Sequence, residues 1–244
     1  MNSSGSLFLI VSFLVMALAL LVTLVVAISL ASSLATRRRD TAASALAAGT
    51  WFALWSVVGA SRVLDVWDSR PPRVLFMLVP TLIACVLLAR SSIGLKVANR
   101  FDAASLVGFQ AFRLPLELMM YRAACEGLMP MQMSFRGYNY EVVTGTVALL
   151  LWLVARRWAL PRWVLIAFNA LGLATLTTVV GIAIAAMPMF AAFGPNSLNV
   201  WVTHFPYLLL PTVMVPLALG GHLLLLRKSY RQSGPSALVG LERA

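Results

Sequence analysis

The chain has 244 residues, of which 61% are hydrophobic and only 11% are charged, and its formal net charge is +11. An average soluble domain has roughly 25% charged residues, so this composition excludes an ordinary soluble domain and indicates a helical membrane protein. The basic residues stand at the ends of apolar runs, where they orient helices and meet anionic lipid. We therefore attribute the positive charge to a membrane location and expect no nucleic-acid partner.

Seven apolar runs follow one another along the chain, and most of them reach the roughly 20 residues that a helix needs to cross a bilayer. We expect helices at 7–34, 42–61, 74–89, 103–128, 142–154, 163–187 and 200–226. The predicted fold class is all-α, a polytopic transmembrane bundle of seven spans. We take 1–228 as a single transmembrane domain and 229–244 as a polar cytoplasmic tail.

The distribution of Lys and Arg gives this bundle a direction. Four of these residues fall on one side of the predicted membrane, two lie inside the fourth helix, and thirteen fall on the other side. The thirteen are Arg37, Arg38, Arg39, Arg90, Lys96, Arg100, Arg156, Arg157, Arg162, Arg227, Lys228, Arg231 and Arg243. Because cytoplasmic connectors carry the excess of basic residues, we expect the N-terminus outside and the C-terminus in the cytoplasm. The asymmetry disappears unless the fourth helix spans.

The fourth predicted helix holds charges inside an otherwise apolar segment. Arg113 and Glu117 are four residues apart, so we expect them to pair on one helix face, and Gln110 falls on the same face. Pro115 cannot donate to the carbonyl of Ala111, which predicts a kink and a free acceptor. Ionisable groups in a membrane usually face the bundle interior and often mark function. The alternative is a structural ion pair that only fixes helix packing.

The outer end of this helix carries a second pair and a short connector. Arg122 and Glu126 repeat the four-residue spacing, and extension to the headgroups explains them adequately. In the connector that follows, we expect Gly137 and Asn139 to form a tight turn over the outer end of the fourth helix.

The last two predicted helices add polar groups. Asn169 lies in the sixth helix, and both histidines of the chain, His204 and His222, fall in the seventh. The histidines are eighteen residues apart, so we expect them on one face, near opposite membrane surfaces. Prolines at 206, 211 and 216 predict that this helix is bent or partly unwound. We find no metal-ligand spacing and no cofactor motif, and expect neither a metal nor a cofactor.

Three motifs together resemble an uncharacterised group of bacterial multi-pass membrane proteins. The first is the segment 112–117, Phe-Arg-Leu-Pro-Leu-Glu, and the second is the loop 133–141, Met-Ser-Phe-Arg-Gly-Tyr-Asn-Tyr-Glu. The third combines His204-Phe205-Pro206, Leu210-Pro211, Val215-Pro216 and His222. The similarity covers roughly 101–228. It implies a bacterial plasma membrane location, and it implies no activity.

Our leading hypothesis is a polar site between the fourth, sixth and seventh helices that binds or passes a small solute or a proton. Its ligand-binding residues would be Gln110, Arg113, Glu117, Asn169 and His204. The second hypothesis is a structural or accessory subunit without its own ligand, in contact with a protein partner or with further copies of itself. The third is an intramembrane enzyme acting on a lipid-like substrate, with Glu117 or His204 as base. The sequence favours a non-enzymatic role. The first hypothesis predicts a water-accessible cavity and the second a filled core. The third predicts a lateral opening to lipid.

Overall fold

In the computed structural model, which describes residues 5–231, the chain is a bundle of helices, and this range contains no strand. The α-helices are α1 (Leu7–Ala31), α2 (Arg37–Ser61), α3 (Leu75–Arg90), α4 (Ser92–Arg100), α5 (Ala103–Phe109), α6 (Arg113–Cys125), α7 (Glu141–Ala155), α8 (Arg162–Ala185) and α9 (Val215–Arg231). Three 3₁₀ turns, η1 (Gln110–Phe112), η2 (Met131–Met133) and η3 (Trp201–Thr203), and one π-helical turn, η4 (Leu210–Met214), complete the chain.

Four helical segments are long and apolar enough to cross a membrane: α1, α2, α8 and the segment Leu210–Tyr230. A fifth results if α3 and α4, which meet at a bend of 61°, form one broken span. The helix α7 is apolar but has only 15 residues. Helix length and composition therefore support an all-α, multi-pass integral membrane protein. The predicted tail begins inside α9, and its part beyond Arg231 lies outside the described residues.

The helix α1 shows how the outside of the bundle is built. One of its faces is fully buried at Leu9, Phe13 and Ala17, where Phe13 packs edge to face against Tyr207 with ring centroids 5.1 Å apart. The opposite face exposes large apolar side chains at helical spacing, namely Leu7, Val11, Val15, Leu18 and Val22. A helix that is apolar all round is suited to a lipid environment on its outer side.

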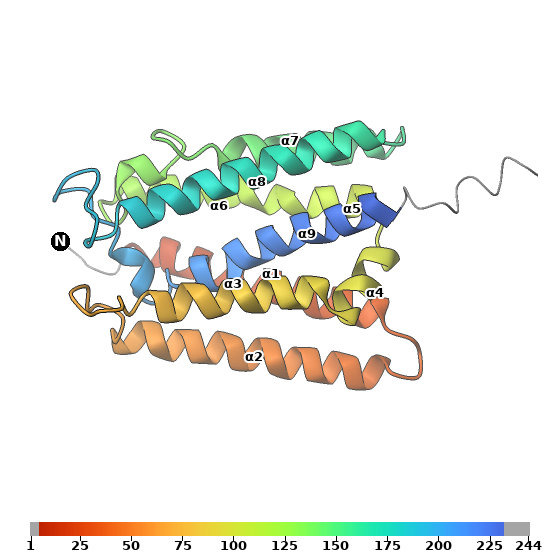
Figure 1. Cartoon of the computed structure of the whole chain (residues 1–244), viewed down its shortest axis with the longest axis horizontal. Helices are drawn as coiled ribbons and strands as arrows, with labels where there is room; N and C mark the ends of the chain where they lie inside the picture. The colour runs from red at the N-terminus through yellow and green to blue at the C-terminus, as the bar shows by residue number, and fades with distance from the viewer. Residues whose placement is uncertain (1–4, 232–244) are drawn as a thin grey trace, which may run out of the picture.

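The connectors alternate between the two ends of the bundle (Figure 1). The connectors α2–α3, α6–α7 and α8–η4 lie at the end where α1 begins, and the connectors α1–α2, α4–α5 and α7–α8 lie at the opposite end. In the figure α7 and α8 form one side of the bundle and α2 forms the other, with α9 between them.

The predicted connector between the third and fourth helices, 90–102, contains the helix α4, which corrects the sequence interpretation. Ser91 caps the N-terminus of α4, because its hydroxyl accepts a hydrogen bond from the Gly94 N–H at 3.2 Å. Val97 and Ala98 are buried while Arg100 remains exposed, so α4 is a short amphipathic helix. Sequence hydropathy alone could not identify it, because its apolar face is only three residues wide.

The seventh predicted helix begins ten residues later than expected. The segment 200–209 forms η3 and turns, and the helix starts with the π-turn η4 before continuing as α9. Pro216 has no N–H to donate to the carbonyl of Thr212. The Trp51 indole of α2 donates to that carbonyl instead, at 2.8 Å. The proline-rich stretch is thus distorted, as the sequence predicted, and a neighbouring helix supplies the missing hydrogen bond.

Candidate functional site

The fourth predicted helix is interrupted at η1 rather than at Pro115. The chain passes from α5 through one tighter 3₁₀ turn into α6, which begins at Arg113. Pro115 then stands in the first turn of α6, where a missing N–H removes little. Gln110, Arg113 and Glu117 all face the interior, with 1%, 1% and 2% of their surfaces exposed. The prediction that these side chains face the bundle interior is confirmed.

The prediction that Arg113 pairs with Glu117 is wrong. Among the described residues, Arg113 forms its ion pair with Glu141 at the start of α7, with 3.0 Å between Nε and Oε2. This contact lacks hydrogen-bond geometry, so its attraction is electrostatic. Arg113 Nη1 also donates to the carbonyl of Gly172 on α8, at 3.5 Å. The i, i+4 spacing allowed the expected pair, but α7 brings a second carboxylate closer.

A close helix crossing makes this possible. A Cβ on Gly145 of α7 would lie 2.7 Å from the backbone nitrogen of Leu114. Only glycine allows the two backbones to approach this closely. Gly145 lies one turn after Glu141, so the crossing brings the Glu141 carboxylate against Arg113. The fifth predicted helix, which the sequence left out of the site, therefore contributes to it.

Glu117 is held by the connector between α6 and α7. The Asn139 amide donates to both Glu117 carboxylate oxygens, at 2.9 and 2.8 Å, and also to the carbonyl of Met133 at 3.0 Å. Asn139 Oδ1 in turn accepts from the Glu141 N–H at 3.0 Å, which joins Glu117 to the first turn of α7. The Gly137 N–H closes a turn onto the Ser134 carbonyl at 2.8 Å. The predicted folding of this connector over α6 is confirmed.

A second polar group lies between η1, α8 and α9, near the Gly172 carbonyl to which Arg113 donates. His222 is completely buried, and its Nδ1 lies 2.8 Å from Asn169 Oδ1. Because that oxygen accepts, Nδ1 carries the hydrogen and Nε2 is left as an acceptor. Gln110 Nε2 donates to the carbonyl of Ala218 at 3.0 Å. A Cβ on Gly172 would lie 2.2 Å from His222 Cε1, so this glycine makes room for the ring.

Several buried polar atoms around Arg113 have no hydrogen-bond partner among the described residues. Apart from Arg113 Nε and Glu141 Oε1 of the ion pair, they are Gln110 Oε1, Arg113 Nη2, Asn169 Nδ2 and His222 Nε2. Buried polar atoms usually find partners, and internal water often supplies them. Two of these atoms donate and two accept, so small polar molecules could bridge them.

The charged group opens into a cavity of about 230 Å³ between α3, α6, α8 and the start of α9. Arg113, Glu117 and Glu141 line it, and Asn199 is the only other polar side chain that the described part of the chain contributes. Every other lining residue has an apolar side chain. Three of them, Leu75, Val79 and Ile184, are also exposed on the outer surface of the bundle, at 41%, 48% and 37%.

His204 lies apart from this site. Its Nε2 is 2.9 Å from Asp65 Oδ2 in the α2–α3 connector, and the Thr203 hydroxyl donates to the other Asp65 oxygen at 2.6 Å. His204 does not line the cavity. It also precedes the helix that carries His222, so the expected shared face does not exist. Of the predicted ligand-binding residues, His204 therefore lies outside the cavity that Arg113 and Glu117 line.

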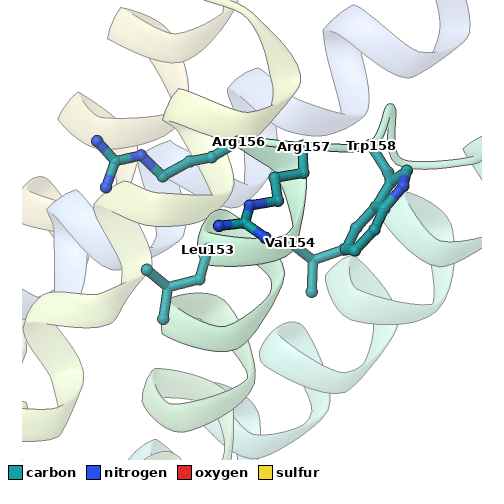
Figure 2. A pocket seen from close by; sticks show the side chains of 5 residues that line it. All are labelled: Leu153, Val154, Arg156, Arg157 and Trp158. Carbon is teal, nitrogen blue, oxygen red and sulfur yellow. The ribbon is translucent and has the colours of Figure 1, made fainter.

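A larger hollow lies on the surface at the C-terminal end of α7 (Figure 2). Its volume is about 540 Å³, and it is lined by Leu153, Val154, Arg156, Arg157 and Trp158. The Arg156 guanidinium carbon lies 5.0 Å from the centre of the Trp152 ring, in cation–π contact. Basic and aromatic side chains of this kind belong to the boundary between membrane and water. The hollow has no carboxylate and lies apart from the buried charges.

Sequence reasoning missed three residues of the buried group: Asn139, Glu141 and His222. The first two stand in the connector 133–141, for which the sequence predicted a tight turn over the outer end of the fourth helix but no place among the ligand-binding residues. Within residues 5–231, no group of three or more His, Cys, Asp or Glu side chains could hold a metal ion.

Fold and site together define a helical, multi-pass membrane protein with a buried charged group beside an apolar cavity. Comparisons with models of known families, with curated proteins and with solved structures find no match.

Proposed function

We propose that this protein binds a small, largely apolar solute inside the membrane, at a site where a proton balances buried charge. The observation that carries the proposal is the cavity of about 230 Å³ that ends on Arg113, Glu117 and Glu141. A ligand pocket is typically apolar with a few convergent polar groups, and this cavity has that character. A purely structural subunit would instead be expected to have a filled core at this position.

The proton follows from counting charges. Among the described residues that line the cavity, Arg113 is the only basic one, and two carboxylates line the cavity with it. With all three groups ionised, the site carries one uncompensated negative charge. An ion buried without compensation costs several kcal/mol. One proton on this pair of carboxylates removes that cost in the absence of ligand.

The exposed lining residues suggest how a ligand arrives. Leu75 and Val79 on α3 and Ile184 on α8 border both the cavity and the outer surface. In a seven-span arrangement, with the basic end of the bundle in the cytoplasm, this border faces lipid in the outer half of a bacterial plasma membrane. The alternation of connectors in Figure 1 supports that arrangement. We therefore propose access from the lipid phase.

An infrared titration of purified protein in lipid nanodiscs tests for the proton on the carboxylate pair. We expect a carbonyl band of a protonated carboxylic acid near neutral pH that is lost in Glu117→Gln or Glu141→Gln. Glu126→Gln, which changes a carboxylate at the outer end of α6, should leave the band unchanged. A wild-type spectrum without the band would contradict the proton-linked site.

The lateral border also favours a second candidate, an intramembrane enzyme acting on a lipid-like substrate. Glu117 would then be the base, since His204 does not line the cavity. Turnover of a radiolabelled lipid mixture that depends on Glu117 would support this candidate over binding alone.

A further inference from the structure

We propose that the ligand of this cavity is a small lipophilic organic cation, an ammonium group on an apolar body, which exchanges with the proton of the carboxylate pair. This inference rests on the proposed function and names the chemical class of its ligand.

The side chains that line the cavity determine the apolar part of the ligand. Apart from Arg113, Glu117, Glu141 and Asn199, every lining side chain is apolar, and no hydroxyl group faces the cavity. Sugars and other many-hydroxyl solutes would lose hydrogen bonds to water there and regain few. The volume, about 230 Å³, lies just below the usual range for ligand pockets, roughly 300–1,000 Å³. The ligand is therefore small.

The charged residues that line the cavity determine the polar part of the ligand. Two carboxylates and one guanidinium leave one negative charge to be balanced, and a cationic ligand balances it as well as a proton does. An anionic ligand would raise the uncompensated charge to two. Phe112 also lines the cavity, and an aromatic face attracts an ammonium group.

The contacts indicate which carboxylate meets the ligand. Glu141 remains paired with Arg113 through the 3.0 Å contact. Among the residues described, the hydrogen bonds to the Glu117 carboxylate come from the neutral amide of Asn139, which donates to both of its oxygens. Among the other described elements packed around the site, α3 brings no charged side chain into the cavity, and α9 carries the buried His222, whose ring lies against Gly172 of α8. Glu117 is therefore the group that loses its proton when the cation binds.

The exchange balances without any further reactant. In the empty site Glu117 holds one proton; in the occupied site its carboxylate faces one ammonium ion, and the proton has passed to water. Binding of one cation should thus release about one proton at neutral pH. A neutral molecule of the same shape should release none.

Isothermal titration calorimetry in nanodiscs, in two buffers with different enthalpies of ionisation, measures both binding and proton release. The probes are benzyltrimethylammonium and its uncharged isostere neopentylbenzene, with empty nanodiscs as the blank. We expect saturable binding of the cation, release of about one proton, and at least about tenfold weaker binding of the isostere. Glu117→Gln should bind without proton release or not at all, and Glu126→Gln should behave as wild type.

Three results would overturn the inference: no saturable binding of the cation up to about 10 mM, equal affinity for the isostere, or cation binding without proton release. The two probes are compared on wild-type protein, so the test does not depend on a variant that folds. If the infrared band of the protonated carboxylic acid is present but the cation does not bind, the proton-linked site is retained and only the proposed ligand class is wrong. If the infrared band is missing, the proposed function itself is wrong.

Discussion

At the residue scale, the central fact is that Arg113 is paired across helices, with Glu141, and not along its own helix. A central arginine costs roughly 2.5–3.5 kcal/mol on insertion scales, and breaking a buried pair typically costs about 3–5 kcal/mol. Glu141→Ala should therefore lower the free energy of unfolding by about 3–5 kcal/mol. The double variant Arg113→Leu/Glu141→Leu should recover much of this loss, because no unpaired charge remains. Unfolding measured by steric trapping in bicelles gives both values, and equal losses in the single and double variants would count against the pair.

Asn139 permits a matched comparison. A buried acceptor that loses its hydrogen-bond partner costs roughly 1–3 kcal/mol. Asn139→Ala should cost about that much, because it removes the bonds to Glu117 and releases the connector from α7. Asn196 lies exposed in the α8–η4 connector, so Asn196→Ala should change stability by less than about 0.5 kcal/mol. Similar values for the two variants in the same unfolding assay would mean that Asn139 does not hold Glu117.

Glu126 gives a pH prediction at the outer end of α6. Hydrogen bonds from the backbone N–H of Ser6, then from Arg122 and the Ser6 hydroxyl, hold the pKa of Glu126 below its ordinary value of 4.5. A lowered folded-state pKa adds stability that is complete above the unfolded-state pKa, here about 4.5, and is lost as the pH falls through the folded-state pKa. The protection of backbone amides at the start of α1, measured as the intrinsic exchange rate divided by the observed rate at the same pH, should therefore fall below about pH 4.5. In Glu126→Gln this loss of protection should be absent.

At the element scale, the crossing of α6 and α7 depends on one glycine. A Cβ at Gly145 meets backbone, which cannot turn aside, so Gly145→Ala should destabilise by about 1–3 kcal/mol through overpacking. Gly181 on α8 is the control, since a Cβ there meets nothing within 4 Å. Gly181→Ala should be neutral or stabilise by up to about 1 kcal/mol, from helix propensity. The two thermal unfolding curves should move in opposite directions or by clearly different amounts.

The same elements show what a sequence reveals. Burial of Gln110, Arg113 and Glu117 followed from the cost of charge in an apolar segment, and the turn at Gly137 followed from residue type. The partner of Arg113 did not follow, because it depends on how closely α7 crosses α6 in three dimensions. His204 was misplaced for a similar reason: the sequence showed prolines but not where η3 and the turns after it give way to helix.

At the scale of the whole molecule, the arrangement of connectors suggests a topology that labelling can test. Ser33 lies in the α1–α2 connector and Ser69 in the α2–α3 connector. We expect Ser33→Cys to react with a membrane-impermeant maleimide only from the cytoplasmic side and Ser69→Cys only from outside. The background carries Cys125→Ser, since Cys125 is exposed, while Cys85 is buried. Reaction of both positions from the same side would contradict the proposed spans.

Access from the lipid phase to the cavity beside Glu117 is central to the proposed function, and fluorescence quenching tests it directly. Bimane would be attached at Ala183→Cys, which lines the cavity, and at Gly181→Cys, which lies exposed two residues earlier on α8. Spin-labelled lipids should quench both labels, and iodide in the water phase should quench neither. Quenching of the Ala183→Cys label by iodide alone, or by neither agent, would contradict access from the lipid phase.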